Sequence, residues 1–255
     1  MRYVAIGDIH GNYNELNELL EVLWNETDFS SDTFIFLGDY VDGGPDTDKV
    51  LYSIIDFGHL YPHWVFLKGN HEDLMLDALR YNGRRYDPGR SERNHTLWWE
   101  QGGRATFESF AKSQFPEFDD YHRSLLSCHD VITDDILDWV DARPLIHETD
   151  EFVFVHAGLR PHKEIHETSE MDMLWIRSYF YTSGYDWGKR VVFGHTYFEN
   201  PIVEPNKIGI DTLVRYGNTH RGHLSAVILD SDHPERQRFV TADPAICERW
   251  NDIWS

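Results

Sequence analysis

Five short apolar segments in this chain each run directly into a glycine-bearing turn that carries Asp, Asn or His. Short apolar runs that end at Gly or Pro are typical of buried strands. The polar residues that follow these runs are Asp8 with His10, Asp39, Asn70, His156 and His195. Because ligands bind beyond the carboxyl ends of strands in open α/β sheets, the five turns predict one shared site that the fold must assemble.

The N-terminal part of the chain predicts alternating strands and helices. After the first predicted strand, Leu16, Leu19, Leu20 and Leu23 repeat at the spacing of one helix face. The strands are predicted at residues 2–6, 33–37 and 64–67, and the helices at residues 13–24, 48–57 and 72–81. This β-α-β-α-β-α order indicates a parallel sheet with helices on its faces.

The character of the sequence changes over residues 82–141. A basic, loop-like stretch is followed by helical patterns at residues 96–113, 121–127 and 134–142. Few strand signals and no clear linker occur here, so we predict a helical insertion over one edge of the site, within a single domain spanning residues 1–255. The pair Trp98 and Trp99, close to Gly102 and Gly103, is interpreted as core packing of this insertion.

The second half of the chain is rich in predicted strands. They cover residues 144–147, 151–155, 190–193, 201–204, 207–210, 224–229 and 236–241. Their density and the short turns between them predict a mostly antiparallel second sheet. The expected fold class is therefore α/β, with two mixed sheets face to face and helices outside. The apolar residues of the C-terminal tail, including Trp250, are expected to pack on this body.

Composition excludes several classes of protein. Hydrophobic residues make up 41% of the chain, which is typical of a globular protein rather than a disordered one. The formal net charge of -21 disfavours non-specific binding to nucleic acid. No apolar stretch is long enough to span a bilayer and no signal peptide is recognised, so we expect no membrane partner and a cytoplasmic location. The two cysteines indicate reduced thiols.

The residues at the five turns predict a metal centre. They offer nitrogen and oxygen ligands without thiolate, a set that suits Mn, Fe, Zn or Mg. One tetrahedral ion needs fewer ligands than these, so two ions bridged by one carboxylate, roughly 3.5–4 Å apart, fit better. His71, next to Asn70, is placed to protonate a leaving group, and Asp42 is placed to hydrogen-bond its other ring nitrogen.

These motifs together resemble a known family. They read Gly7-Asp8-Ile9-His10-Gly11, Gly38-Asp39-Tyr40-Val41-Asp42, Gly69-Asn70-His71-Glu72, His156-Ala157-Gly158-Leu159 and Gly194-His195-Thr196. Their order and spacing resemble those of the calcineurin-like metallophosphoesterases, from residue 2 to about residue 230. More narrowly, they resemble the serine/threonine protein phosphatases of the PPP type in their bacterial and phage form.

The resemblance implies a four-layered α/β/β/α metallophosphoesterase sandwich and a role for each site residue. The first metal ion would be held by Asp8, His10 and Asp39, and the second by Asp39, Asn70, His156 and His195. His71 would be the general acid, oriented by Asp42. Arg177, in Leu174-Trp175-Ile176-Arg177, would bind the phosphate together with Asn70. Manganese is the expected metal, with iron or zinc as alternatives.

One position departs from the family pattern. The family usually has Arg-Gly after the equivalent of Asp42, and that arginine contacts the phosphate, whereas this chain has Gly43-Gly44. The nearest candidate replacement is Arg160, and the other candidates are Arg84, Arg85 and Arg104. The metal ligands are untouched, so the departure bears on phosphate affinity and substrate class.

The sequence therefore predicts a metal-dependent phosphoric ester hydrolase acting on phosphoserine or phosphothreonine in proteins. A metal-bridging hydroxide would attack phosphorus in line, and the substrate would be a phosphoprotein or a small phosphoester. Glu72, after Asn70 and His71, looks more like the protein-phosphatase type. The alternatives are a nucleotide hydrolase, such as a symmetric diadenosine tetraphosphatase, and a non-catalytic metal-binding protein. The oligomeric state is left open.

Overall fold

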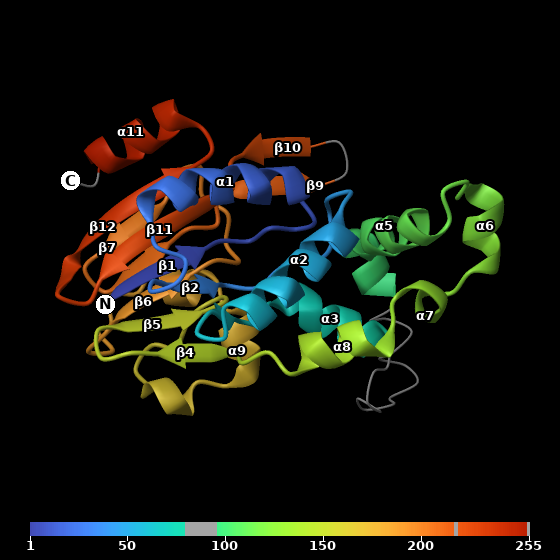
Figure 1. Ribbon diagram of the computed structural model, residues 1–255. Helices are drawn as coiled ribbons and strands as arrows, with labels where there is room; N and C mark the ends of the chain where they lie inside the picture. Colours follow the sequence, from blue (N-terminus) through green and yellow to red (C-terminus); the bar gives the residue numbers. More distant parts are fainter. Residues whose placement is uncertain (80–95, 217–218, 254–255) are drawn as a thin grey trace.

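Two five-stranded β-sheets lie face to face in the computed structural model, which describes residues 1–79, 96–216 and 219–253 (Figure 1). The first sheet has the order β12-β11-β1-β2-β3. Its strands are β1 (Arg2–Ile6), β2 (Thr33–Phe36), β3 (Val65–Phe66), β11 (Ser225–Asp230) and β12 (His233–Thr241). As predicted, β1, β2 and β3 run parallel. The strands β11 and β12, which the sequence placed with the second sheet, extend this one instead. β11 runs antiparallel to β1, and β12, being antiparallel to β11, has the same direction as β1.

The second sheet has the order β4-β5-β6-β8-β7. Its strands are β4 (Ile146–Glu148), β5 (Phe152–Val155), β6 (Arg190–Phe193), β7 (Ile202–Glu204) and β8 (Lys207–Gly209). The expectation of a mostly antiparallel sheet is wrong, because the central strands β5, β6 and β8 are parallel and only the edge strands run the other way. A crossover through α9 (Glu170–Trp175) and α10 (Ser178–Tyr181), which the sequence pattern did not predict, sets this direction.

The space between the sheets is filled by apolar side chains from both. Ala5 and Ile35 of the first sheet belong to the same buried cluster as Phe154 and Val192 of the second. Trp250 of α11 (Pro244–Ile253) closes one edge of this layer and is 1% exposed, so the tail packs on the body as predicted. The polar turns at the strand ends are thereby mounted on a rigid, dry layer.

Helices cover the outer face of each sheet. The predicted leucines of α1 (Tyr13–Glu26) are buried, and with α2 (Thr47–Leu60) and α3 (Asn70–Ala78) they cover the first sheet. Phe180 and Met173 pack on the outer face of the second sheet. Figure 1 shows the resulting order of helix, sheet, sheet and helix.

The predicted helical insertion is present and projects beyond the two sheets (Figure 1). Its described elements are a π-helical turn (Trp99–Gly103), α5 (Arg104–Gln114), α6 (Asp120–Leu125), α7 (Cys128–Val131) and α8 (Asp134–Asp141). Its first part, with the candidate phosphate contacts Arg84 and Arg85, lies outside the described residues. Phe107 and Phe110 of α5 belong to the same buried cluster as Val50 of α2, which attaches the insertion to the body.

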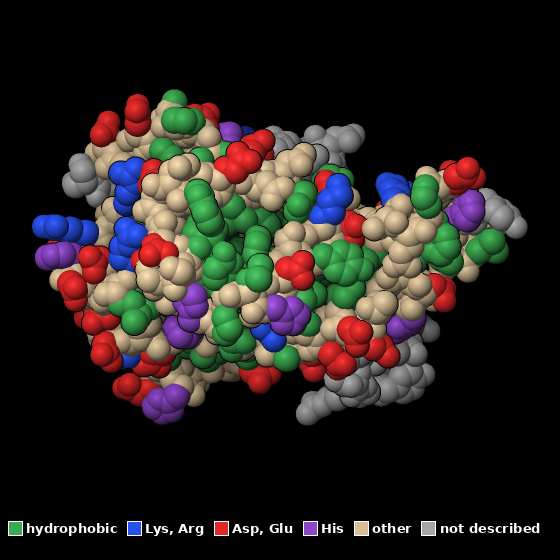
Figure 2. Space-filling view, viewed as in Figure 1, with side chains coloured by type: hydrophobic (Ala, Val, Ile, Leu, Met, Phe, Trp, Pro, Cys, Tyr) green, Lys and Arg blue, Asp and Glu red, His purple; other side chains and the backbone are tan. Residues whose placement is uncertain are grey.

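A short hairpin near the C-terminus was not predicted. It consists of β9 (Leu213–Tyr216) and β10 (Thr219–Gly222). Asp and Glu side chains are scattered over the face shown in Figure 2, in keeping with the net charge. Within the described part of the chain, no helix combines the length and the apolar character that crossing a bilayer requires.

Candidate active site

The five predicted turns meet where the two sheets present the carboxyl ends of their parallel strands. Five non-glycine residues among those described have a positive φ, and four of them are His10, Asp39, Asp42 and His195. Such a backbone conformation is uncommon for residues with a Cβ and persists only where the surroundings enforce it. The strained backbone at these positions directs their polar side chains toward a common site.

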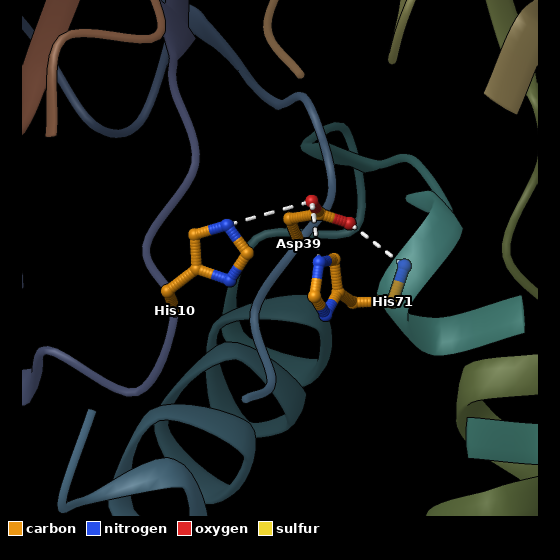
Figure 3. Close-up of side chains that lie close together, drawn as sticks. All are labelled: His10, Asp39 and His71. Carbon is orange, nitrogen blue, oxygen red and sulfur yellow. Dashed lines mark hydrogen bonds and ion pairs between the residues drawn. The ribbon is translucent and has the colours of Figure 1, made fainter. Parts of the chain in front are cut away.

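Asp39, at the end of β2, lies at the centre of the site (Figure 3). Its Oδ2 lies 3.5 Å from His10 Nε2 and 4.0 Å from His71 Nε2, and its Oδ1 lies 3.4 Å from His156 Nε2. Two groups of side chains are therefore spaced to hold a metal ion, and Asp39 belongs to both. The first group is His10, Asp39 and His71, and the second group is Asp39, His156 and His195. A carboxylate shared by two groups is the arrangement that a bridged pair of ions requires.

The ring nitrogens of the histidines favour cations in the gaps between them. His10 Nδ1 lies 2.9 Å from the carbonyl oxygen of Val41, and His156 Nδ1 lies 2.9 Å from that of Leu37. A carbonyl oxygen can only accept, so each Nδ1 donates, and each Nε2 of the neutral ring is left with a lone pair. His156 Nε2 then faces another acceptor, Asn70 Oδ1, at 2.8 Å. Facing lone pairs are stabilised by a shared cation, and backbone anchoring of the second nitrogen is the usual support of a metal-ligating histidine.

Buried atoms without hydrogen-bond partners support the same conclusion. Among the described residues these include Asp8 Oδ1, His195 Nε2 and Asp211 Oδ1. The other oxygen of Asp8 accepts from the backbone N–H of His195 at 2.9 Å, which links the first turn to the last. A buried carboxylate or imidazole without a partner is costly, so these residues fit a bound divalent cation.

Electrostatics keep most of these groups in the state that metal binding needs. Burial lowers the pKa of His10 and His156, and burial with the neighbouring His156 lowers the pKa of His195 to about 2. These rings are therefore neutral at pH 7, as ligands must be. Burial would raise the pKa of Asp39, but attraction to the surrounding histidines holds it below its usual range, and His71 is the one that stays protonated at pH 7.

Asp8 shows the opposite behaviour. Burial and repulsion from Asp211 and Asp39 raise the pKa of Asp8 well above its usual range. Crowded buried carboxylates lack a compensating positive charge, and a bound cation would supply it.

His71 differs from the other histidines of this site because a carboxylate holds its Nδ1. Asp42 Oδ2 lies 2.7 Å from that atom, as the sequence predicted. Burial alone would lower the pKa of His71, but Asp39 and Asp42 outweigh it and raise the pKa to about 9. The ring lies near enough to Asp39 to be a ligand, but a protonated imidazole does not ligate metal ions. It is instead ready to donate a proton.

Glu72 is a buried residue whose role the sequence reasoning missed. Its carboxylate accepts four backbone N–H bonds of 2.8–3.1 Å, from Asp39, Tyr40, Val41 and Gly69. It therefore joins the turn after β2 to the turn after β3. Its place three residues after Gly69, at the start of a helix, is a capping signal that could have indicated this.

A cavity of about 410 Å³ opens onto the predicted ligands. Besides His10, Asp39, His71 and His195, its described lining contains Gly43, Gln101, Arg177, Tyr197, Asp211 and Leu213. Arg177 is its single Arg or Lys side chain among the described lining residues, and its Nη1 donates to the carbonyl oxygen of His195 at 2.9 Å. That bond orients the guanidinium beside the candidate ligands.

The model of the calcineurin-like phosphoesterase family matches residues 1–223, which is most of the chain. The chain belongs to the calcineurin-like phosphoesterases. A symmetrical bis(5'-nucleosyl)-tetraphosphatase of Methylococcus capsulatus is 31% identical over 161 residues, 63% of this chain and 44% of the relative. The serine/threonine-protein phosphatase rdgC of Drosophila melanogaster is 40% identical over 91 residues, 35% of this chain and 13% of the relative. The chain spans about half the length of the tetraphosphatase relatives that it matches.

Solved structures share the fold of this phosphoesterase. A putative diadenosine tetraphosphatase covers 95% of this chain, and this chain covers 94% of it, with a TM-score of 0.60 and 21% identity. A cold-active protein-tyrosine phosphatase of Shewanella gives a TM-score of 0.59 at 17% identity, with 95% of this chain and 78% of that chain covered. Both are consistent with the predicted two-sheet sandwich.

Two of the arginines considered as replacements at Gly43 have other partners in this phosphoesterase. Arg160 forms a two-point ion pair with Asp172 at 2.7 and 3.0 Å. Arg104 pairs with Glu108 at 2.8 Å on the outside of α5. Neither is among the described residues that line the cavity. Gln101, Tyr197 and Asp211, none of which was predicted as a site residue, do line it.

Proposed function

We propose that this chain is a metal-dependent hydrolase of nucleoside polyphosphates, such as diadenosine tetraphosphate. The observation that carries the hydrolase assignment is the site around Asp39, where neutral imidazoles and unpartnered buried carboxylate atoms adjoin a protonated His71. The similarity to symmetrical tetraphosphatases over 63% of the chain supports the nucleotide class and favours the alternative stated above over the protein-phosphatase interpretation.

Asp8, His10, Asp39, Asn70, His156 and His195 would hold two divalent cations, manganese being the first to test. When bound, the cations would neutralise phosphoryl charge and lower the pKa of an attacking water. Arg177 donates to a phosphoryl oxygen beside Asn70 and orients the group for in-line attack.

The chain's own acid completes the reaction. As the oxygen of water bonds to phosphorus, the bond to the leaving oxygen breaks and takes its electron pair. His71 Nε2 gives its proton to that oxygen, while Asp42 stabilises the imidazolium before transfer and holds the ring in place. Solvent then returns a proton to His71.

Hydrolysis of phosphoserine or phosphothreonine is the second candidate function. The pair of His71 and Asp42 favours it, because an alkoxide leaving group needs a proton more than a phosphate leaving group does. The match to a serine/threonine-protein phosphatase, although it covers only 35% of this chain, points the same way.

A matrix of metals and substrates tests both functions. Rates on diadenosine tetraphosphate and on a phosphoserine peptide are measured with Mn, Fe, Zn and Mg after removal of bound metal. The proposal predicts that the nucleotide has the higher kcat/KM and that two ADP molecules are released. Faster hydrolysis of the peptide would assign the second function. No hydrolysis of either substrate with any metal would return the chain to the non-catalytic alternative.

A further inference from the structure

Asp42 has contacts that the reaction does not explain. Its Oδ2 faces His71, but its Oδ1 accepts from Trp98 Nε1 at 3.0 Å and from Thr106 Oγ1 at 2.7 Å. The backbone N–H of Asp42 also donates to Thr106 Oγ1 at 2.9 Å. All three residues are fully buried, and both donors belong to the helical insertion, more than fifty positions away in the chain.

The insertion holds the whole loop that carries Asp42. One helical turn after Thr106, Ser109 Oγ donates to Asp48 Oδ1 at 2.5 Å and accepts from the N–H of Asp48 at 3.0 Å. α5 therefore turns two hydroxyl groups towards the residue 42–48 segment. Helices packing through their apolar faces alone would not need these bonds.

The π-helical turn of the insertion packs tightly against the backbone next to Asp42. Gly102 has a φ of +111°, and a Cβ at this position would lie 2.6 Å from the backbone nitrogen of Gly43. A Cβ on Gly103 would overlap the indole of Trp98. Two glycines in the π-helical turn thus let the insertion approach the residues next to Asp42 and seat the indole that donates to it.

We infer that Trp98 and Thr106 are positioning residues for the proposed acid, because they fix the Asp42 carboxylate so that its Oδ2 holds His71 in line with the cavity. With two donors on Oδ1, the carboxylate cannot rotate freely about χ2, and the orientation of the His71 ring follows from it. The positive φ of Asp42, +71°, is the kind of backbone strain that such surroundings stabilise. The helical insertion is thereby part of the catalytic apparatus, and not only a cover over it. This inference rests on the proposed function of His71.

The test removes each donor while its shape is kept. Trp98→Phe removes the indole N–H, and Thr106→Val removes the hydroxyl. Thr106→Ser retains the hydroxyl and is the conservative rescue. Ser109→Ala is the matched control, since it removes a buried bond of the same helix to the same segment without touching Asp42.

Two measurements separate positioning from general damage to the fold. The first is kcat on an alkyl phosphate and on p-nitrophenyl phosphate, whose leaving group needs little protonation. We expect Trp98→Phe and Thr106→Val to lower kcat on the alkyl ester about tenfold and on the aryl ester less than about twofold. The second is the downfield proton resonance of His71 Nδ1–H, assigned by its absence in His71→Asn. It should move or be lost in both variants and stay unchanged in Ser109→Ala and Thr106→Ser.

Equal loss of kcat on both esters, or an unchanged His71 resonance in both variants, would overturn the inference. The resonance is measured on the protein without substrate. If the parent hydrolyses neither ester, the resonance alone decides whether Trp98 and Thr106 position His71. The proposed function fails only if diadenosine tetraphosphate is not hydrolysed either.

Discussion

Two cavities lined by described residues lie at opposite ends of the second sheet, and the larger of these two is not the candidate active site. One of about 410 Å³ lies at the carboxyl ends of the strands, and one of about 530 Å³ lies where β5 and β6 begin. The described lining of the larger cavity includes Asp150, Glu151, Lys189, Arg190 and Glu235. The larger cavity is therefore rich in charged side chains. The two cavities differ, however, in whether their buried polar atoms have hydrogen-bond partners.

At the larger cavity, most cations have partners. Lys189 Nζ donates to Glu148, and Arg190 Nη1 donates to Gln237. Among the described residues that line this cavity, the only buried side-chain nitrogen or oxygen atom without a hydrogen-bond partner is Arg190 Nε. The smaller cavity has unpartnered atoms on its lining residues His195 and Asp211, and Asp8, which accepts from the N–H of His195, has another. The backbone is strained at several of the turns around it. Unsatisfied, converging ligands identify a site better than volume does.

The largest effect should come from removing the shared carboxylate. Asp39→Asn takes charge from both candidate ligand groups, so we expect metal binding to weaken and turnover to fall at least about 10³-fold. Metal content and kcat measure this. Glu235→Gln, at the other cavity, should leave both unchanged, and an equal loss there would remove the distinction between the two ends.

The second prediction compares one arginine from each cavity, Arg177 and Arg190. Arg177→Ala removes the guanidinium from the smaller cavity, and we expect kcat/KM for phosphate substrates to fall about 10- to 100-fold, since a charge-assisted contact is lost. Arg190→Ala should lower thermal stability, because its side chain is half-buried, and leave KM unchanged. If KM rises equally in both variants, Arg177 has no special role with the phosphate.

The pH dependence of the free energy of unfolding should also distinguish a variant at the smaller cavity from one at the larger cavity. The pKa of His71 is raised from 6.5 to about 9 on folding, so its stabilisation of the metal-free protein is fully present below pH 6.5 and lost as pH rises through about 9. The contribution is on the order of 3 kcal/mol. Urea unfolding at pH 6 and pH 9.5 should show this loss in the parent and a smaller one in His71→Asn.

The control for that curve is Glu235→Gln, which should follow the parent over the whole pH range. A His71→Asn variant that loses as much stability as the parent would show that other groups carry the pH dependence.

The smallest effect is expected at a pair of glycines with similar backbone. Gly43 and Gly188 have φ values of +84° and +77°, one at each cavity. Alanine at either position should destabilise the protein by about 1 kcal/mol, since both require the left-handed region. Only Gly43→Ala should also lower kcat, because Gly43 adjoins Asp42 and packs on Gly102. For the same reason Gly43→Arg should impair the site rather than restore a phosphate contact.

The N-terminal strands, the leucine face of α1 and the convergence of polar residues at the turns were predictable from the sequence, because they are local. A strand followed by a polar turn needs only neighbouring residues to be recognised, and five such turns in a sheet protein imply a common edge. The pairing of Asp42 with His71 was also predictable from these motifs. The membership in the phosphoesterase family followed from their order.

The direction of β5, β6 and β8, the surroundings of Asp42 and the lining of the cavity were decided only by tertiary structure. Short strands carry no local signal for the partner beside which they will lie, since register and direction depend on pairing across the chain. Trp98 was correctly expected in the core, but its single N–H meets Asp42 because α5 packs against the loop after β2. Sequence alone determined which groups could do the chemistry, and long-range packing decided how each of them is held.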